Sequence, residues 1–301
     1  MRVSDFRLAI ASSRQFPTVH HDDVHLVATL ERLGVQTTVC VWNDPQVEWT
    51  TFDAVLIRTI WDYFEHYTAF RAWLDMLDRL EVITINDTST LRWNSDKRYL
   101  LDLEQQGVPV IPTHIAQGSG LQDALSSMSG HDVVIKPTVS GGAWHTVRGK
   151  VGTADLQEAI ERLPKKLDYL VQPFVPEIAS SGEWSLMFFD NTYSHAVLKR
   201  PTAGDYRVQE QHGGITSQAT PDDHIVEAAS KALAATATLG HRELAYARVD
   251  GVVANGRFLV MELEVIEPSL FLAQRPDAAE RFAQRLVERL QRIARKTPQL
   301  G

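Results

Sequence analysis

Cysteine is almost absent from this chain of 301 residues, which holds a single one, Cys40. One cysteine cannot close a disulfide within the chain, so we expect a reducing, cytoplasmic setting. Long apolar runs are also missing: no stretch reaches the 18 residues that a membrane-spanning helix needs, and the charged segment Met1–Arg7 is unlike a secretory signal. We therefore expect no membrane partner.

Positive charge is scarce as well. The chain has 30 Lys and Arg against 38 Asp and Glu, a net charge of −8. Nucleic acid needs a basic surface, so we do not expect it as the main partner. Neither Gly-x-x-x-x-Gly-Lys-Ser/Thr nor Gly-x-Gly-x-x-Gly occurs. A nucleotide site in this chain must therefore be built in another way.

Apolar strand-like segments alternate with amphipathic helix-like ones through the first 86 residues. Strands are expected at 7–12, 35–41, 52–58 and 82–86, and helices at 22–33 and 67–80. This alternation predicts an open parallel sheet, which binds ligands beyond the carboxyl ends of its strands. Arg58, Trp61 and Tyr63 follow the third strand. They could hold a substrate carboxylate, or they could form a capping and packing cluster, and both interpretations remain open.

A shorter unit follows a break near Pro112. We expect a helix that begins within 94–98 before it, and in it helices at 122–128 and 154–163 and strands at 133–136 and 168–172. Lys136 ends an apolar strand and is followed by Ser140-Gly141-Gly142. A buried ammonium needs an anion, and small residues let backbone N–H groups approach anionic oxygens. This loop therefore suits a nucleotide phosphate, although its signal alone is weak.

The C-terminal part centres on a hairpin signal at Asn255-Gly256. A three-residue turn through Arg257 would pair Asp250 with Glu262, and Arg248 with Glu264. The three carboxylates would then share one face, and oxygen-only ligands suit Mg²⁺ or Mn²⁺ that bridges phosphates. The alternative is an exposed acidic strand face. Because like charges repel, we expect neutralisation of Glu262 to stabilise the protein without metal.

Further strands are expected at 183–189 and 193–198, and further helices at 222–239 and 278–295, with a basic, glycine-rich loop over 199–214. Taken together, widely spaced motifs resemble those of ATP-grasp ligases, above all prokaryotic glutathione synthetase and the ATP-grasp branch of cycloserine biosynthesis. The motifs are Asp53–Arg58, Asn86–Lys97, Lys136, Val171–Glu177, Arg200–Gly214 with Gly204-Asp205-Tyr206-Arg207, the 250/262/264 carboxylates and Met261–Phe271.

The resemblance covers most of the chain and implies an ATP-grasp fold of the α/β (α+β) class. It would have three parts: an N-terminal substrate domain with an open parallel sheet over 1–112, a small central lid over 113–175, and a C-terminal catalytic domain with an antiparallel sheet over 176–301. ATP and Mg²⁺, with two ions per site, are the implied cofactors.

The resemblance also implies roles for individual residues. Phosphate contacts would come from Lys97, Lys136, Ser140, Gly141 and Gly142. The backbone of Gln172, Pro173, Phe174 and Val175 would bind adenine, and Glu177 or Glu183 would bind ribose. Asp250, Glu262 and Glu264 would hold the metal. Arg207, with Arg248 as a further candidate, would stabilise the phosphoryl group in transfer. Arg58, Trp61, Tyr63 and Glu267 would form the substrate site.

The implied reaction joins a carboxylate to an amine or amide through an acyl phosphate and releases ADP and phosphate. A small amino-acid-like substrate is expected, with ring closure as in D-cycloserine formation. The alternatives are a peptide ligase like glutathione synthetase, or a nucleotide-binding regulatory protein without turnover. The chain departs from the family by having Glu264 where Asn is usual, and Glu267 would suit a substrate ammonium. A homo-oligomer is compatible with these expectations.

Overall fold

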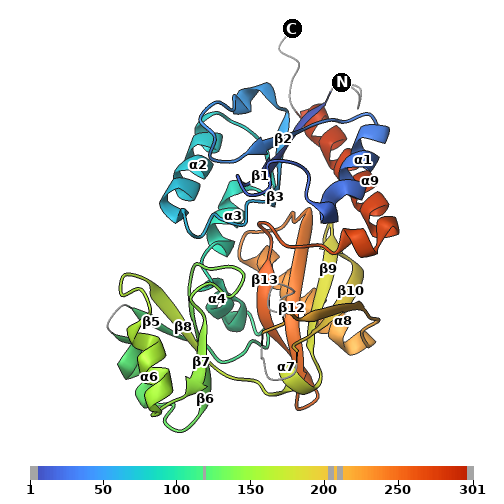
Figure 1. Cartoon of the computed structure of the whole chain (residues 1–301). Helices are drawn as coiled ribbons and strands as arrows, with labels where there is room; N and C mark the ends of the chain where they lie inside the picture. Colours follow the sequence, from blue (N-terminus) through green and yellow to red (C-terminus); the bar gives the residue numbers. More distant parts are fainter. Residues whose placement is uncertain (1–5, 118–119, 203–206, 209–212, 297–301) are drawn as a thin grey trace.

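The computed structural model describes residues 6–117, 120–202, 207–208 and 213–296. The strands of these ranges form three sheets (Figure 1): an N-terminal parallel sheet, a small sheet of the central unit, and a larger antiparallel sheet. No helix in the described ranges is long and apolar enough to cross a membrane. The α/β fold class expected from the sequence is confirmed.

The N-terminal sheet is parallel throughout, with strand order β2-β1-β3-β4. Its strands are β1 (Arg7–Ser12), β2 (Gln36–Val41), β3 (Ala54–Thr59) and β4 (Thr84–Ile85). The helices of this unit are α1 (Val24–Arg32), α2 (Tyr67–Arg79), α3 (Thr88–Asn94) and α4 (Tyr99–Gln105). Two short helices precede α1 and β3: η2 (His21–Asp23) and η3 (Trp49–Thr51). The predicted alternation of strands and helices is confirmed. The helix expected to begin within 94–98 is present as α4, but it begins later, at Tyr99, and residues 94–98 contain the end of α3 and a turn. There α3 ends, because Asn94 turns its side chain to the backbone of Leu263 and Val265.

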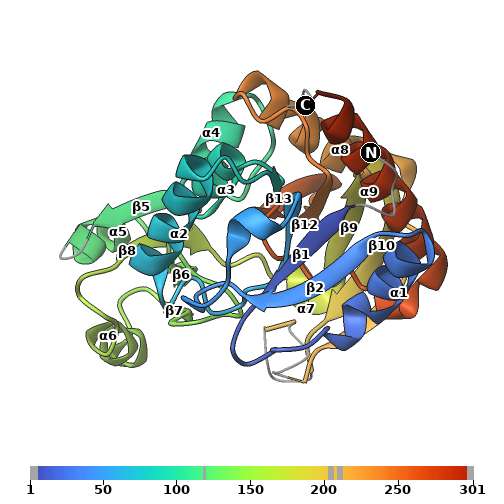
Figure 2. The same cartoon turned by 90° about the horizontal axis from the view of Figure 1, so that it is seen from above.

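Both faces of this sheet are covered, as its alternating side chains require. Leu8 and Leu56 face α1, while Ala9 and Ile57 face the aromatic side of α2. The last helix, α9 (Pro276–Lys296), lies beside α1 on the first of these faces (Figure 2). The C-terminal end of the described chain therefore packs on the N-terminal sheet.

The central unit has an antiparallel sheet of order β5-β8-β6-β7. Its elements are β5 (His114–Gln117), α5 (Leu121–Ser126), β6 (Asp132–Pro137), β7 (Val147–Lys150), α6 (Ala154–Glu161) and β8 (Asp168–Pro173). Both helices pack on one face of the sheet around a small apolar core that includes Val133, Leu156 and Val171. The other face is left to the rest of the molecule, and β6 delivers Lys136 to it.

The third sheet is antiparallel, with order β11-β10-β9-β12-β13. Its elements are α7 (Glu177–Ser180), β9 (Glu183–Phe189), β10 (Thr192–Arg200), β11 (Ile215–Gln218), α8 (Asp223–Thr238), β12 (Tyr246–Ala254) and β13 (Arg257–Glu264), followed by η6 (Leu272–Gln274). The alanine-rich α8 covers one face through Ala229 and Leu233. The opposite face carries the polar residues described below.

The hairpin of β12 and β13 has the predicted pairing but reaches it differently. Asp250 pairs with Glu262, and Arg248 with Glu264, as expected. The turn, however, has two residues, because Ala254 pairs with Arg257, and Asn255 and Gly256 both have positive φ. The expected three-residue turn is wrong. The extra residue lies farther along β13, in a β-bulge between Val260 and Glu262 that restores the shared face.

Candidate active site

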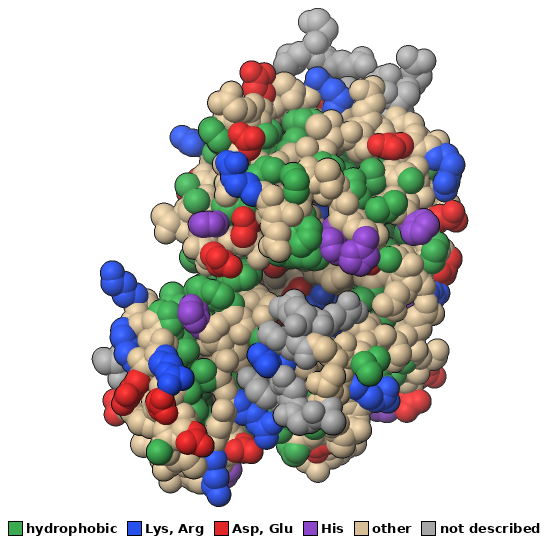
Figure 3. Space-filling model, viewed as in Figure 1, with side chains coloured by type: hydrophobic (Ala, Val, Ile, Leu, Met, Phe, Trp, Pro, Cys, Tyr) green, Lys and Arg blue, Asp and Glu red, His purple; other side chains and the backbone are tan. Residues whose placement is uncertain are grey.

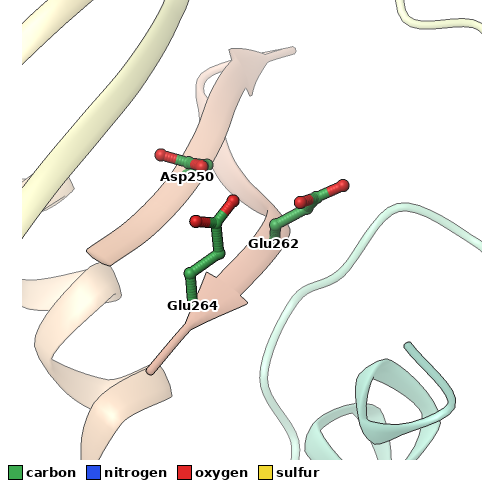
Figure 4. Close-up of side chains that lie close together, drawn as sticks. All are labelled: Asp250, Glu262 and Glu264. Carbon is green, nitrogen blue, oxygen red and sulfur yellow. The ribbon is translucent and has the colours of Figure 1, made fainter. Parts of the chain in front are cut away.

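Three carboxylates converge on the open face of the antiparallel sheet (Figure 4). Asp250 comes from β12, and Glu262 and Glu264 stand two residues apart on β13. One oxygen of each lies within 4.8 Å of the others. The expected proximity is confirmed, and a compact set of carboxylate oxygens fits Mg²⁺ in donor type and spacing.

Arg248 lies between two of these carboxylates. Its guanidinium donates to both oxygens of Asp250 at 2.9–3.1 Å and to Oε1 of Glu264 at 2.6 Å. Burial disfavours the charge on Asp250, but Arg248 and Lys199 outweigh it and lower the pKa of this carboxyl. Glu264 behaves in the opposite way: burial, with Asp250 and Glu262 nearby, raises its pKa to about 7 despite Arg248. A divalent cation here would relieve that repulsion.

Lys97 and Lys136, the two lysines expected to contact phosphates, both reach Glu262. Nζ of Lys136 lies 2.5 Å from Oε1 of Glu262, and Nζ of Lys97 lies 3.6 Å from Oε2. Burial raises the pKa of Glu262, but the two ammonium groups more than offset this and lower it. Lys136 comes from β6, and Lys97 from the turn between α3 and α4. All three sheet units thus meet at this carboxylate.

Lys199 belongs to the same cluster, although the sequence analysis placed it in the basic loop and did not name it as a site residue. Its side chain is buried, and Nζ lies 2.5 Å from Glu183 and 3.7 Å from Asp250. Ser185, also unforeseen, donates to Asp250 through its hydroxyl. The predicted strand ended at residue 198, whereas β10 continues to Arg200 and pairs Lys199 with Glu183. If the predicted strand had been extended by one residue, the alternation of its side chains would have placed Lys199 on the polar face of the antiparallel sheet.

The small-residue loop after Lys136 is packed against the N-terminal unit. The carbonyl oxygen of Ser140 accepts a hydrogen bond from Nζ of Lys97 at 2.9 Å. A Cβ on Gly141 would lie 2.7 Å from Cε1 of Phe64, and the ring of Trp144 lies 5.5 Å from that of Phe64. Gly142 has a φ of +56°, which favours glycine. The loop thus lies where the lysines and carboxylates meet, as a phosphate loop requires.

The segment expected at adenine follows the end of β8. Gln172 is buried and donates from its side chain to Thr113 at 2.8 Å, while the backbone N–H of Phe174 bonds to Asp132 at 2.8 Å. The guanidinium of Arg148 on β7 lies 3.4 Å from the ring centroid of Phe174, a contact that the sequence analysis did not predict. Pro173 is partly and Val175 almost fully buried.

The remaining nucleotide candidates are spread around the cluster. Glu177 begins α7 and is partly exposed. Glu183 is buried, with its carboxylate on Lys199; burial, with Asp250 nearby, raises its pKa despite that lysine. Arg207 is partly buried. The motif residues Gly204, Asp205 and Tyr206 beside it lie outside the described residues.

Two of the expected substrate residues, Arg58 and Tyr63, are buried in the structure. The side chain of Arg58 is 2% exposed; its Nε lies 3.0 Å from Asp23, and its Nη2 donates to the carbonyl oxygen of Pro268 at 3.0 Å. Tyr63 is 4% exposed and packs against Phe70 in the core beneath α2. Among the residues that the structure describes, Nη1 of Arg58 is buried without a hydrogen-bond partner. Burial, with the charges of Glu267 and Glu264 nearby, raises the pKa of Tyr63 well above its usual value. The partner of Arg58 was not foreseen either.

The other two substrate candidates, Trp61 and Glu267, are more exposed. Trp61 is partly exposed and donates from its indole to the carbonyl oxygen of Glu267 at 2.9 Å. The side chain of Glu267 is partly exposed, and burial together with the charge of Glu264 raises its pKa to about 8. A cationic ligand group beside Glu267 would lower that pKa again.

Figure 3 shows a hollow between the N-terminal unit and the two lower units, with charged side chains inside it and histidine side chains at its rim. The β9–β12–β13 face and the loop after β6 come together below the N-terminal sheet in this region (Figure 1). The carboxylates, lysines and Arg248 thus converge where the three units meet.

Comparisons with known proteins identify enzymes that are similar to this chain. The family model for the N-terminal domain of D-cycloserine synthetase DcsG matches residues 8–86. The cycloserine biosynthesis protein DcsG of Streptomyces lavendulae is 33% identical over 296 residues, which cover 94% of this chain and 98% of that protein. The crystal structure of D-cycloserine synthetase DcsG matches with a TM-score of 0.84, 33% identity, and coverage of 94% and 99% of the two chains.

Enzymes with lower sequence identity have a similar fold. D-alanine–D-alanine ligase from Bacillus anthracis matches with a TM-score of 0.71 at 17% identity, with coverage of 97% of this chain and 99% of that one. A relative that is 33% identical over nearly the whole of both chains is sufficient to assign the family. The chain belongs to the DcsG family of ATP-grasp ligases.

Proposed function

We propose that this ligase uses ATP to activate the carboxylate of a small amino-acid-like molecule and then closes a ring within that molecule, as the name of its cycloserine synthetase relatives indicates. The observation that carries the proposal is the meeting of Lys97, Lys136, Lys199 and Arg248 with the three carboxylates on one sheet face. Such a set suits the phosphates of ATP and their metal ions. We place this ATP-dependent enzyme, which has one cysteine, in the reducing cytoplasm.

The nucleotide would lie between the central unit and the antiparallel sheet. Its phosphates would be contacted by Lys97, Lys136 and the loop Ser140–Gly142. The two lysines would then bind phosphate oxygens in place of the Glu262 carboxylate. The segment Gln172–Val175 would border the adenine, and Glu177 or Glu183 would reach the ribose. We take 113–175 as the lid that closes over ATP, with 1–112 and 176–301 as the substrate and catalytic domains.

Asp250, Glu262 and Glu264 would hold Mg²⁺, with two ions as the expected number and Mn²⁺ as a substitute. When bound, the metal would neutralise charge on the β- and γ-phosphates. Arg248 is held by Asp250 and Glu264, so its guanidinium is already oriented at the place where charge develops. Lys199 adds a second fixed cation beside Asp250, and Arg207 is the further candidate for the phosphoryl group.

The proposed chemistry has two steps. A carboxylate oxygen of the substrate attacks the γ-phosphorus, and ADP leaves with the electron pair of the broken P–O bond. A nitrogen of the same molecule then attacks the acyl carbon, phosphate leaves, and the nitrogen loses a proton. D-cycloserine contains such a ring amide, in which the nitrogen is bonded to the side-chain oxygen. A nitrogen-substituted oxygen on a serine-like substrate therefore fits this reaction.

Glu267 would bind the ammonium of this substrate. Burial, with the charge of Glu264 nearby, raises the pKa of the Glu267 carboxyl, and burial, with Asp250 and Glu262 nearby, raises that of Glu264. A substrate ammonium beside Glu267 and metal beside Glu264 would offset both shifts. Trp61, which touches the same loop, would form a flat wall of the site.

The test is phosphate and ADP release with Mg-ATP and O-amino- or O-ureido-serine, each as the D and the L form, with mass spectrometry of the product. We expect phosphate release only with such a substrate, and a cyclic product. Release that requires a separate amine and yields a dipeptide would replace ring closure with the peptide-ligase alternative. ATP binding without phosphate release with any carboxylic acid would identify a regulatory protein.

A further inference from the structure

Residues 265–270, which join β13 to η6, are held by an unusual set of contacts. Six successive backbone carbonyl oxygens each accept a hydrogen bond from a side chain far away in the sequence. The donors, in order from residue 265 to 270, are Asn86 (2.7 Å), Tyr246 (2.7 Å), Trp61 (2.9 Å), Arg58 (3.0 Å), Arg248 (3.1 Å) and His195 (2.9 Å). The single hydroxyl hydrogen of Tyr246 is shared between the carbonyl oxygen of Ile266 and that of Ile57, which lies at 2.8 Å. We call residues 265–270 the clamped segment.

Carbonyl groups outside helices and sheets usually bond to water or to nearby backbone, which leaves a loop free to move. Here the donors come from the N-terminal unit and from β10 and β12, so two parts of the molecule fix one short stretch of backbone. Asp22 completes the set by accepting from the N–H groups of Leu270 and Ala273 at 3.0 Å each. The conformation of the clamped segment is therefore dictated by tertiary contacts.

Glu267 is the only charged residue in the clamped segment. Val265, Ile266 and Leu270 have at most 1% of their surface exposed and anchor the segment in the core. The carboxylate of Glu267, by contrast, is partly exposed and lies close enough to Glu264 to feel its charge. Fixing the backbone on both sides of Glu267 fixes the position of its Cα atom and the direction of its Cα–Cβ bond, and so restricts where its carboxylate can reach.

We propose that Arg58 is a positioning residue that acts through Glu267: with Trp61, it holds the carbonyls of residues 267 and 268 so that the Glu267 carboxylate faces the substrate ammonium. This role rests on the proposed function. Arg58 is nearly inaccessible, and two of its three nitrogens bond to Asp23 and Pro268. It therefore acts on the substrate from behind the loop, without touching it.

A double-mutant cycle separates this role from direct substrate binding. We expect Arg58→Lys to raise the KM for the amino-acid substrate about tenfold, because an ammonium cannot hold Asp23 and the Pro268 carbonyl in the geometry of the guanidinium. Glu267→Gln should raise it similarly, and the KM for ATP should stay within about twofold in both. The double variant should match Glu267→Gln alone, since both changes remove the same interaction.

Additive effects, near a hundredfold in the double variant, would overturn the proposal, because they would show that Arg58 contacts the substrate itself. A lowered melting temperature with unchanged KM would overturn it as well, leaving Arg58 a purely structural role. Arg71→Lys, on the exposed face of α2, is the matched control and should change neither quantity. If Arg58→Lys does not fold, Asp23→Asn removes the carboxylate that holds the guanidinium and takes its place in the cycle.

Hydrogen exchange tests the clamp without any substrate, so failure of the proposed function remains distinguishable. In Arg58→Lys and Trp61→Phe, peptides that span 265–271 should exchange at least several-fold faster, while those from α8 stay unchanged. Unaltered exchange in 265–271 would show that these side chains do not hold the segment, and would overturn the proposal even for an enzyme active in ring closure. Absence of turnover in the wild type would instead reject the proposed function.

Discussion

The carboxylates of the site are distinguished by their individual partners. Glu262 has two lysines, and its pKa is lowered, whereas the burial of Glu264 and Glu267 and the charges around them raise their pKa values to about 7 and about 8. We expected from the sequence that neutralising Glu262 would stabilise the protein by relieving repulsion. The lysines make that expectation wrong, because they would lose their common partner.

Glu262→Gln should therefore abolish Mg²⁺-dependent ADP formation and also lower the free energy of unfolding, on the order of 2 kcal/mol for a largely buried ion pair. Phosphate release and denaturant unfolding measure the two effects. Glu288→Gln, on the exposed surface of α9, is the control and should leave both near wild type. Normal turnover in folded Glu262→Gln would refute the metal assignment, and increased stability would show that Lys97 and Lys136 do not pair with it in solution.

The raised pKa values of Glu264 and Glu267 make stability depend on pH. Unfolded, both carboxyls titrate near 4.5; folded, they retain protons up to about pH 7 and about pH 8. The folded state then binds more protons in this window, so its stability falls as pH rises. Between pH 6.5 and 8 we expect a loss of about 2 kcal/mol without metal. Thermal unfolding of Glu267→Gln should show a shallower dependence, and an equal or steeper slope would contradict it.

Among the elements, the β12–β13 hairpin decides which residues share the catalytic face. Its tight turn at Asn255-Gly256 would by itself set Asp250 against Met261 and turn the aspartate away from Glu262. The β-bulge beside Gly251 corrects the register by one residue. Glycine is required there because a Cβ would lie 2.3 Å from Cζ of Phe258 and 2.6 Å from the carbonyl oxygen of Leu259.

Gly251→Ala should accordingly lower the free energy of unfolding by roughly 2–4 kcal/mol and reduce turnover strongly, since backbone cannot move aside as a side-chain tip can. Gly120→Ala is the matched control: its Cβ would have no neighbour within 4 Å, and its φ is −75°. We expect that variant to be close to wild type in unfolding and turnover. Equal stability of the two variants would mean that the bulge is not as tight as the structure shows.

On the scale of the whole molecule, the site exists only where three units meet. Lys136 and the loop after it come from the central unit, Lys97 from the N-terminal one, and the carboxylates from the antiparallel sheet. The packing of Gly141 and Trp144 against Phe64 closes the central unit on the N-terminal one. The proposed lid should therefore respond to nucleotide binding.

Hydrogen exchange in residues 136–147 should slow when a non-hydrolysable Mg-ATP analogue binds, because the loop closes over the phosphates. Phe64→Ala should weaken this protection, since it removes the apolar surface that the closed loop meets. Peptides from α1, far from the proposed nucleotide, provide the internal control. Identical exchange of 136–147 with and without the analogue would argue against a mobile lid.

The sequence by itself determined the alternation of strands and helices over the first 86 residues, the parallel N-terminal sheet, and the hairpin at Asn255-Gly256 that carries Asp250, Glu262 and Glu264. These features follow from local periodicity and turn chemistry, which neighbouring residues encode. The tertiary structure decided the rest: the position of the bulge, the packing of α9 on the N-terminal sheet, and the partners of Arg58 and Lys199. A buried charge is satisfied by whichever group the fold brings to it, and Asp23 lies 35 residues before Arg58 in the chain. No local pattern records such a pairing, because it arises only when separate units pack together.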